Sequence, residues 1–484
     1  MKLLWQNRLL VWLILFILVN LIIRGTGDAN QNSRYMTMRA ICNDYSFQTN
    51  KYIHWTDDWA KTPDGNYYSI KAPGPMLLTF PLFCFMDFFS KTFDKKHWQN
   101  WQKFGMERTP PGPAHTIILT LFTQIIPFAI IVGMLILYLQ RENYPFNGIY
   151  FMTLALLFGN TSALFMNTFF GHGIVAFFMV AMIYFLLKEN FKLVGLFFAL
   201  SLLSDYMIAL AFPPLILTIF LINKTSTPTS PPKKWMLNLF DISIGGFIPA
   251  LLWCWYHYSS FGGIFTIANT FSNPDVMFGK NNLSEFFSSS NGSEILYQLL
   301  IGKSRGMLYT VPWILFFLAL SIPLLLKNNK NLICNHRSHR LHRFHKPLIL
   351  FSLISFFLFI LLNSTFVGWH SGSSPGPRYI SAIFPVFAIV IALEWNFIPK
   401  MAKLLLWIML GFSILFRNLV CATTILSKIE GGMGIWEWHV NYLIKDPLFP
   451  KHLLRFIILM ALFALALLFT HLRKKIYFCS ANQL

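Results

Sequence analysis

Ionisable residues of this chain gather in six short segments that contain glycine, proline or serine and adjoin long apolar runs. The segments are RGTGDANQNSRYMTMRA (24–40), HWTDDWAKTPDGNYYSIKAPGP (54–75), FFGHG (169–173), LSDY (203–206), GKSRG (302–306) and GWHSGSSPGPRY (368–379). Charged groups at the edge of a bilayer are costly, so those that occur are usually functional or paired. Carboxylates there could act as general bases, and lysine or arginine could bind a phosphate. The six segments predict one polar site, provided that they share a side of the membrane.

Asp28 is the first choice for a general base. It follows the first apolar run and two glycines, whose flexible backbone would let the carboxylate turn back toward the membrane surface. A solvated carboxylate that only marks the end of the helix is the alternative. Asp58 and Asp205 are supporting acids, and Asp205, at a predicted turn, could also pair with an arginine. Asp64 lies in Pro-Asp-Gly, a strong turn signal, and is predicted to be a turn residue.

Three cations are candidates for binding a phosphate. Lys71, Arg305 and Arg378 each lie in a loop bounded by glycine or proline, beside an apolar run. Arginine offers a phosphate bidentate contacts and lysine offers a point charge. The alternative is that these side chains only extend along apolar surface toward the lipid headgroups.

Four further residues are assigned to the substrate pocket. They are Arg34, Tyr68, His172 and Trp369. The two aromatic residues could stack on a sugar. An aromatic belt at the membrane surface would produce such residues without any ligand.

The composition is that of a membrane protein. Of 484 residues 55% are hydrophobic and only 12% are charged, whereas soluble domains carry about a quarter charged residues. The formal net charge of +20 comes from lysines and arginines in short clusters between apolar runs, which is typical of cytoplasmic loops. No continuous basic stripe exists, so nucleic-acid binding is not expected.

The apolar runs predict an all-α integral membrane protein with about 12 transmembrane helices, within a range of 11 to 13, each run being judged against the roughly 20 residues that a spanning helix needs. The runs are 8–23, 114–139, 148–165, 170–187, 193–204, 206–222, 238–258, 308–326, 347–366, 379–397, 404–426 and 452–472. Residues 1–484 then form a single membrane domain. Its larger extracytoplasmic loops are 24–113, with interfacial helices, 259–307 and 427–451.

The distribution of lysine and arginine tests this topology. With the N-terminus inside, these residues accumulate in every second loop, as the positive-inside rule requires. Pro75–Phe89 is also apolar, and counting it as a span would invert everything downstream. Because it is short, contains Pro81 and includes Asp87, it is predicted to be interfacial or re-entrant.

The sequence gives little support for a metal site or a redox site. The six cysteines show no CxxC spacing and are interpreted as small core residues. His336, His339, His342 and His345 follow Cys334 in a basic loop predicted to be cytoplasmic, away from every other motif, and a spacing of three drifts around a helix. HEXXH, P-loop and GxGxxG patterns are absent, so chemistry on a soluble nucleotide is not expected.

At the motifs described above the chain resembles the GT-C superfamily of polytopic glycosyltransferases. It looks closest to the branch of protein O-mannosyltransferases and lipid A aminoarabinose transferases. The resemblance rests on Asp28, SRY (33–35), DGNYYSIKAPGP (64–75), FFGH (169–172), SRG (304–306) and WHSGSSPGPRY (369–379), in that order. It differs from relatives where Ala29 follows Asp28 in place of a second acid, and where Lys71-Ala72-Pro73 replaces Lys-Pro-Pro.

The resemblance implies an inverting glycosyltransferase that moves a sugar from a polyprenyl-phosphate donor to a hydroxyl of a lipid, glycan or protein acceptor. By similarity Asp28 would be the base, and Lys71 and the arginines would stabilise the departing phosphate. It also implies a bacterial inner-membrane protein with its site facing the periplasm. Some relatives use a divalent metal ion, so a metal stays an open option and no other cofactor is expected. The alternatives are a transporter or flippase of a lipid-linked or anionic solute, and a structural subunit.

Overall fold

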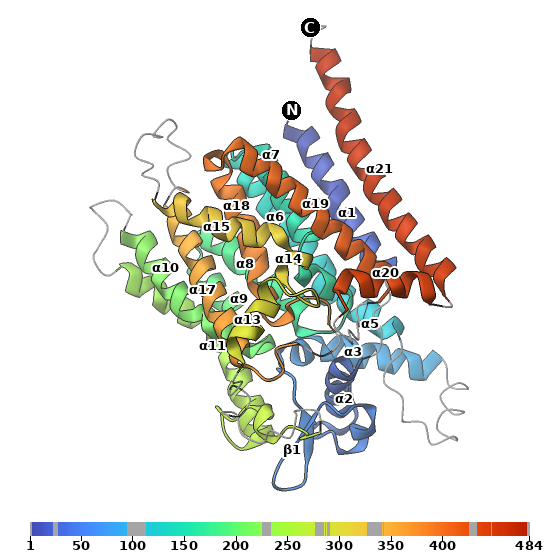
Figure 1. The fold of residues 1–484 in the computed structure, drawn as a ribbon. Coiled ribbons are helices and arrows are strands. Elements are labelled where there is room, and N and C mark those ends of the chain that lie inside the picture. Colours follow the sequence, from blue (N-terminus) through green and yellow to red (C-terminus); the bar gives the residue numbers. More distant parts are fainter. Residues whose placement is uncertain are drawn as a thin grey trace.

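The computed structural model describes residues 2–22, 28–93, 113–224, 234–275, 285, 287, 291–326, 341, 343–370, 372, 374–424, 433–446 and 448–481. Most of these residues are helical (Figure 1). The bundle consists of α1 (Lys2–Ile22), α5 (Pro113–Thr120), η2 (Leu121–Ile125), α6 (Ile126–Arg141), α7 (Phe146–Leu157), η3 (Thr161–Asn167), α8 (Gly171–Leu187), α9 (Phe191–Ser204), η4 (Tyr206–Ala211), α10 (Phe212–Lys224), α11 (Lys234–Phe261), α14 (Met307–Thr310), α15 (Pro312–Leu326), α17 (His345–Thr365), η6 (Arg378–Ile383), α18 (Phe384–Glu394), η7 (Trp395–Phe397), α19 (Lys400–Ala422) and α21 (Phe449–Ala481).

Seven of the described helices are long and apolar enough to cross a membrane, or eight if the bent pair α7 and η3 counts as one span. Each of the twelve predicted apolar runs overlaps a helix, several of them shorter. The class of helical multi-pass membrane protein is therefore confirmed, whereas the number of twelve spans stays a prediction.

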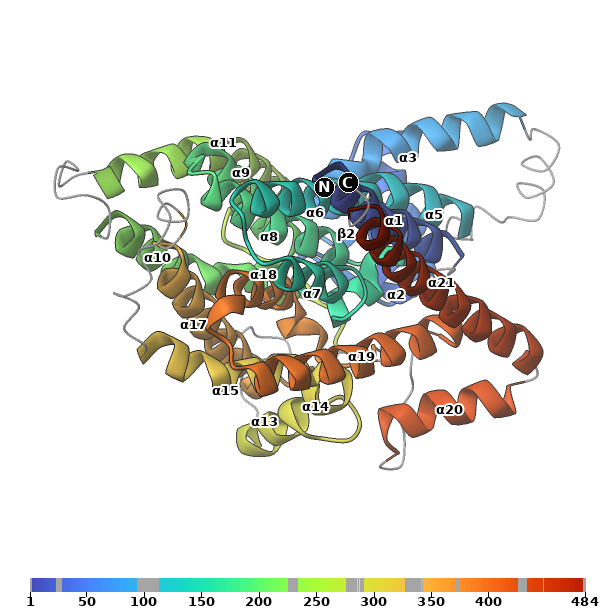
Figure 2. The same cartoon turned by 90° about the horizontal axis from the view of Figure 1, so that it is seen from above.

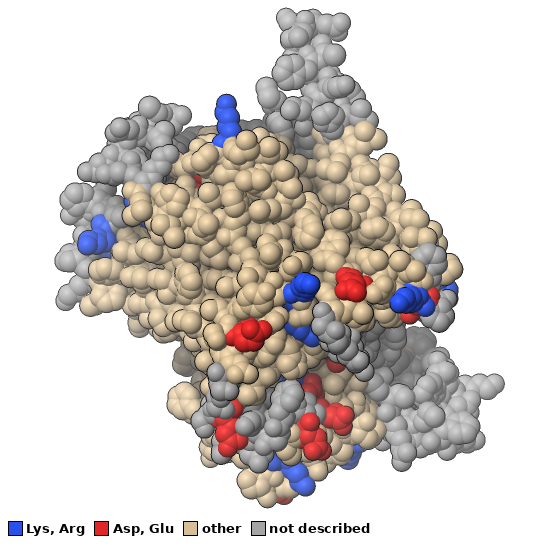
Figure 3. All heavy atoms as spheres, viewed as in Figure 1, with Lys and Arg blue, Asp and Glu red and all other residues tan. Residues whose placement is uncertain are grey.

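The surface of the bundle agrees with this class. Figure 3 shows a broad band with almost no charged side chains over the upper part of the molecule, and charged residues at its top edge and below it. Large apolar side chains of the bundle helices are well exposed, among them Phe357, Ile408 and Leu465. Exposed apolar patches of this size are typical of surfaces that face lipid.

The helix predicted over 148–165 is broken by the side chain of Asn160. Its amide donates to the carbonyl oxygens of Ala155 and Leu156 and its oxygen accepts from Ala163 N. These bonds end α7 and cap η3, because a short polar side chain competes with the helix for backbone groups. The two segments meet at 50°.

The first predicted extracytoplasmic loop folds into a small unit at the lower end of the bundle (Figure 1). It contains α2 (Ala29–Asp44), η1 (Asn50–Trp55), the antiparallel strands β1 (Trp59–Lys61) and β2 (Tyr67–Ser69), and α3 (Gly74–Phe93). The second loop contributes η5 (Ala268–Phe271) and α13 (Gly292–Leu300), and the third contributes α20 (Ile435–Lys445). Ala60 on β1 forms a bridge with Ser272, so the first two loops pack together.

Helix α3 covers the segment 75–89 that decides the topology. Figures 1 and 2 show that it lies across the direction of α1 and α21. Its apolar stretch Gly74–Phe89 is shorter than the seven candidate spans, and Phe85 and Phe88 expose 59% and 65% of their surface. This orientation and exposure suit a helix in the membrane surface.

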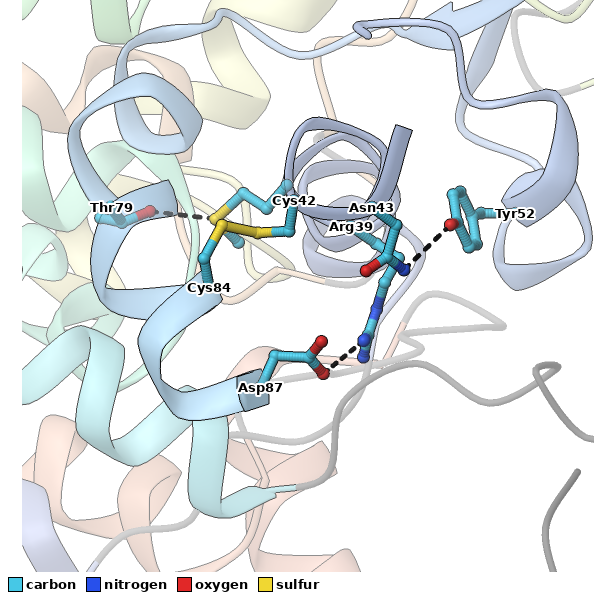
Figure 4. Close-up of a disulfide and its surroundings, with 8 residues drawn as sticks. Arg39, Cys42, Asn43, Tyr52, Thr79, Cys84 and Asp87 are labelled. Atoms are coloured by element: carbon cyan, nitrogen blue, oxygen red, sulfur yellow. Dashed lines mark hydrogen bonds and ion pairs between the residues drawn. A yellow bond between two sulfur atoms is a disulfide. The ribbon is translucent and has the colours of Figure 1, made fainter. Parts of the chain in front are cut away.

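Cys42 of α2 and Cys84 of α3 form a disulfide bond (Figure 4). The interpretation of these two cysteines as small core residues was therefore wrong. A disulfide connects residues far apart in sequence, so their spacing gave no signal. Beside it Arg39 of α2 pairs with Asp87 of α3, and both side chains are buried. The two links fix α3 against α2.

Candidate functional site

Two of the predicted carboxylates pair with predicted cationic or histidine side chains. Lys71 Nζ lies 2.7 Å from Asp58 Oδ2, and His172 Nδ1 lies 3.3 Å from Asp205 Oδ2. Both carboxylates are largely buried. These pairs come from four different elements, which the fold brings to the same end of the bundle.

Ser33 of α2 holds the segments that carry Asp58 and Lys71. Its hydroxyl donates to the carbonyl oxygen of Asp58 at 2.6 Å and lies 2.7 Å from the hydroxyl oxygen of Ser69. Ser69 Oγ in turn accepts from the backbone N–H of Lys71 at 3.1 Å. This chain of hydrogen bonds is fully buried at its centre, so it sets the spacing between the acid and the cation.

Arg34 interacts electrostatically with the carboxylates of both pairs, Asp58 and Asp205. Its side chain is buried and donates to the carbonyl and side-chain oxygens of Asn30. Burial lowers the pKa of Arg34 to about 10, opposed by the charge of Asp58 and reinforced by that of Arg378. Asp205 and Asp28 also act on it. The guanidinium stays protonated at neutral pH and interacts with the charges of three carboxylates and of a second arginine.

We call this set the charged cluster. It comprises Asp28, Arg34, Asp58, Lys71, His172, Asp205 and Arg378.

Close backbone packing makes this convergence feasible at Ser204, just before Asp205. A Cβ atom on Gly74 would lie 2.3 Å from Ser204 Oγ, and one on Gly171 would lie 2.7 Å from the carbonyl oxygen of Ser204. No side chain fits at either position. The glycines of KAPGP and FFGH therefore let α3 and α8 approach the end of α9.

Asp28 makes fewer contacts with the described residues than the other two carboxylates do. It is half-buried and caps α2 through one long bond, 3.4 Å from Asn30 N to Oδ1. Asp58 is held by Lys71, and Asp205 both contacts His172 and caps η4 through Met207 N at 3.1 Å. Within the described part of the chain, the Asp28 carboxylate is therefore the one of the three with the fewest bonds to other side chains.

Arg378 lies against aromatic rings at the start of η6. Its guanidinium carbon is 5.5 Å from the ring centre of Phe170 and 5.2 Å from that of Tyr379, and the side chain is only 8% exposed. The Nε atom has no hydrogen-bond partner among the described residues. A buried guanidinium with donors to spare is suited to bind an anion.

Arg305 is placed differently from the other predicted phosphate ligands. It donates to the carbonyl oxygens of Ser374 and Gly372, the latter at 2.6 Å, and thereby supports the loop that leads to Arg378. Burial and the nearby charge of Arg378 lower the pKa of Arg305 to about 10. Burial lowers the pKa of His370, and the charges of Arg305 and Arg378 lower it further.

Tyr68 and Trp369 do not join the charged cluster in this conformation. The ring of Tyr68 packs edge to face on Phe261 at 5.5 Å, within a hydrophobic group under the β-strands. Trp369 packs against the main core, and its ring lies 6.0 Å from that of His370. Asp64 is exposed in a turn with Gly65 at φ +86°, as its Pro-Asp-Gly context predicts.

The donor groups of the charged cluster do not fit a divalent metal. Asp58 and Asp205 lie in separate pairs, each facing a basic side chain, and no group of three His, Cys, Asp or Glu residues suited to a metal occurs in the described part of the chain. His336, His339, His342 and Cys334 lie outside the described residues. His345 contacts Glu394 at 2.8 Å and Tyr144 at 2.9 Å.

Two buried polar residues near the membrane had escaped the sequence analysis. Arg417 of α19 is 1% exposed and stacks on Phe158, and its one described hydrogen bond goes to Asn20 at 3.3 Å. Gln31 of α2 accepts from Phe169 N at 2.9 Å and so fixes α2 to the FFGH segment. Arg417 in an apolar run was the available signal; Gln31 in a polar loop gave none.

Comparisons of the chain with protein-family models and with curated protein sequences found no match. The resemblance to GT-C glycosyltransferases therefore rests on the motifs described above.

Proposed function

We propose that this protein is an inverting glycosyltransferase that moves a sugar from a polyprenyl-phosphate donor to an acceptor hydroxyl on the extracytoplasmic side of the membrane. The observation that carries the proposal is the charged cluster itself. It combines a lightly bonded carboxylate, Asp28, with buried cations, Arg34, Lys71 and Arg378, at one end of a membrane bundle. A base and an anion site side by side are what this transfer requires.

The surroundings of the cluster suit a lipid-linked donor. Gly74, the first residue of α3, packs against Ser204 beside Asp205, and farther along α3 Phe85 and Phe88 are exposed. A phosphate could thus face the cations while its prenyl tail follows an apolar helix surface. The disulfide Cys42–Cys84 also supports an extracytoplasmic location, because disulfides persist in oxidising compartments such as the periplasm.

The positions of the charged side chains suggest a role for each of them in the transfer. Asp28 takes the proton of the acceptor hydroxyl while its oxygen bonds to the anomeric carbon. The bond between that carbon and the phosphate oxygen breaks on the opposite face, and polyprenyl phosphate leaves with the electron pair. Lys71 and Arg378 stabilise the growing negative charge on the phosphate, and general-base assistance contributes roughly 10²–10⁴-fold.

The test uses purified protein in mixed micelles with a panel of polyprenyl-phosphate sugars, and it follows release of polyprenyl phosphate. Asp28→Asn should lower turnover about 100-fold or more while the thermal transition stays in place. Asp64→Asn is the matched control, since Asp64 is an exposed carboxylate of the same loop. Full turnover by Asp28→Asn would exclude Asp28 as the base, and no turnover of any donor by the wild type would argue against the proposed reaction.

Binding of the product tests the phosphate site independently of the acceptor. Wild-type protein should bind polyprenyl phosphate, and Lys71→Ala and Arg378→Ala should each weaken binding about tenfold or more. Lys61→Ala, on the exposed hairpin, is the control. If all variants bound polyprenyl phosphate equally well, the charged cluster would not be the phosphate site.

A second candidate, transport of a lipid-linked or anionic solute, is favoured by one interrupted helix. The break between α7 and η3 at Asn160 resembles the discontinuous helices of transporters. Reconstituted vesicles that move a fluorescent polyprenyl phosphate across the bilayer without cleaving a donor would support it.

A further inference from the structure

An apolar groove runs between α1, α7, α19 and α21, on a part of the bundle that the proposed reaction does not use. Two adjoining cavities of about 920 Å³ and 400 Å³ form it, and they share Asn147, Tyr150 and Leu467. Figure 2 shows α21 at the edge of the bundle. One wall of the groove is therefore a helix at the outer surface of the bundle.

The walls of the groove change character along its length. Lys403, Asn147 and Asn396 lie at one end, where α7 and α19 begin. Leu154, Ile414 and Phe463 line the other end. Aromatic side chains, Tyr150 of α7 and Trp395 of η7 among them, lie near the polar end, as is usual at a membrane surface.

The length of the groove matches one leaflet. Lys403 and Ile414 both lie on α19 and both line it. At 1.5 Å per residue their positions are separated by about 16 Å along the helix. Half of a hydrocarbon core of about 30 Å is about 15 Å. A molecule with a polar head at Lys403 would therefore bury its chains as far as the middle of the bilayer.

The polar end carries an uncompensated positive charge. Lys403 lies over the ring of Trp395, 5.6 Å from its centre, and forms no ion pair within the described residues. The exposed Lys400 lies one turn earlier on the same helix but does not line the groove. Positive charge at the membrane surface attracts anionic headgroups, so Lys403 is the cation placed to hold one.

We propose that this groove binds one anionic phospholipid, with its phosphate at Lys403 and its acyl chains along α7, α19 and α21. The groove is too polar at one end for a purely apolar helix of a second copy, and its apolar end does not suit a soluble anion. This site is separate from the charged cluster and does not depend on the proposed reaction.

The experiment adds phosphatidylglycerol or phosphatidylcholine to delipidated protein and measures bound lipid by native mass spectrometry. Wild-type protein should retain phosphatidylglycerol at least fivefold better than phosphatidylcholine. Lys403→Ala should abolish this preference, whereas Lys400→Ala, outside the groove, should reduce it less than twofold.

A groove-filling variant tests the position of the acyl chains. Gly411 lines the groove, and a Cβ atom there would meet nothing within 4 Å, so Gly411→Leu fits without strain. It should lower binding of both lipids at least fivefold with an unchanged thermal transition. Leu361→Phe, on the exposed surface of α17, is the control and should bind as the wild type does.

Two results would overturn the proposal. One is undiminished phosphatidylglycerol binding by both Lys403→Ala and Gly411→Leu. The other is a wild-type dimer that Gly411→Leu dissociates while lipid binding is unaffected, because the groove would then hold a second copy of the chain.

Discussion

The pair formed by Asp58 and Lys71 illustrates how the charged cluster is built at the residue scale. The side chains are 12% and 17% exposed, so each charge depends on the other for much of its stabilisation. Removing one partner leaves the other charge poorly solvated, whereas removing both charges need not be costly. Stability and activity can thus be separated by substitution.

Lys71→Met is expected to lower the free energy of unfolding by about 1–3 kcal/mol, because Asp58 keeps its charge without a partner. The double variant Asp58→Asn with Lys71→Met should recover most of that loss and yet stay inactive, since the phosphate ligand is still missing. Thermal transitions and donor turnover of the four proteins of this cycle provide the measurement. Recovery of turnover in the double variant would show that the pair is only structural.

His439 of α20 predicts a dependence of stability on pH. It is fully buried, its Nδ1 lies 2.8 Å from Oγ1 of Thr423, the residue directly after α19, and burial lowers the pKa of His439 to about 3. In the unfolded chain His439 has a pKa near 6.5 and binds a proton that it does not bind in the folded chain. The free energy of unfolding therefore falls as the pH drops below about 6.5.

Acidification from pH 7 to pH 5.5 should therefore cost about 1 kcal/mol from this residue. His439→Gln should show a smaller slope of the thermal transition against pH over this range. Asp446, His452 and the other titrating groups stay the same in both proteins, so the difference isolates His439. An unchanged slope would mean that His439 has the same pKa in the folded and unfolded states, contrary to the effect of its burial.

Residue chemistry was predictable where its cause is local. Asp64 forms the turn that Pro-Asp-Gly indicates, and Asp205 lies between two helices at the turn expected from Ser204-Asp205. The pairing of Cys42 with Cys84 was not predictable, because it depends on how α3 lies on α2. The same holds for the partner of each carboxylate in the charged cluster.

At the scale of elements, the disulfide between α2 and α3 helps to hold the charged cluster together. The disulfide closes 42 residues of separation, and loop-closure entropy in the unfolded chain makes such a bond worth about 4 kcal/mol at most. The loop it closes contains Asp58 and Lys71. The disulfide therefore stabilises the site as well as the fold.

The double variant Cys42→Ser with Cys84→Ser should lower the free energy of unfolding by about 2–4 kcal/mol and reduce turnover. A reducing agent should have the same effect on the wild type and none on the variant. Thermal transitions in the presence and absence of dithiothreitol measure both. Insensitivity of the wild type to reductant would show that the bond does not form in the native protein.

The apolar runs predicted where the helices lie, but they did not predict where a helix is broken. The run 148–165 was continuous in hydropathy, and only the hydrogen bonds of Asn160 with Ala155, Leu156 and Ala163 break it. Charge parity along the whole chain predicts that α3 lies in the membrane surface, and this placement stays a prediction. Local sequence alone, with Pro81 and Asp87 in an apolar run, left both orientations open.

On the scale of the whole molecule, one helix decides the side on which everything downstream lies. If α3 lies in the membrane surface, the hairpin turn at Asp64 is outside and the start of α19 at Lys400 is inside. If α3 crosses the bilayer, both positions lie on the same side, and the basic loops would face outward against the positive-inside rule. The two arrangements thus differ at residues that are well exposed.

Cysteine labelling distinguishes the two arrangements. In a background without other unpaired cysteines, Asp64→Cys should react with a membrane-impermeant maleimide in intact spheroplasts, and Lys400→Cys should react only after permeabilisation. Labelling of both residues in intact cells would mean that α3 spans the membrane. Asp28 would then lie opposite Asp205 and Arg378, and because Arg34 senses the charge of all three, such a topology would be incompatible with the folded cluster.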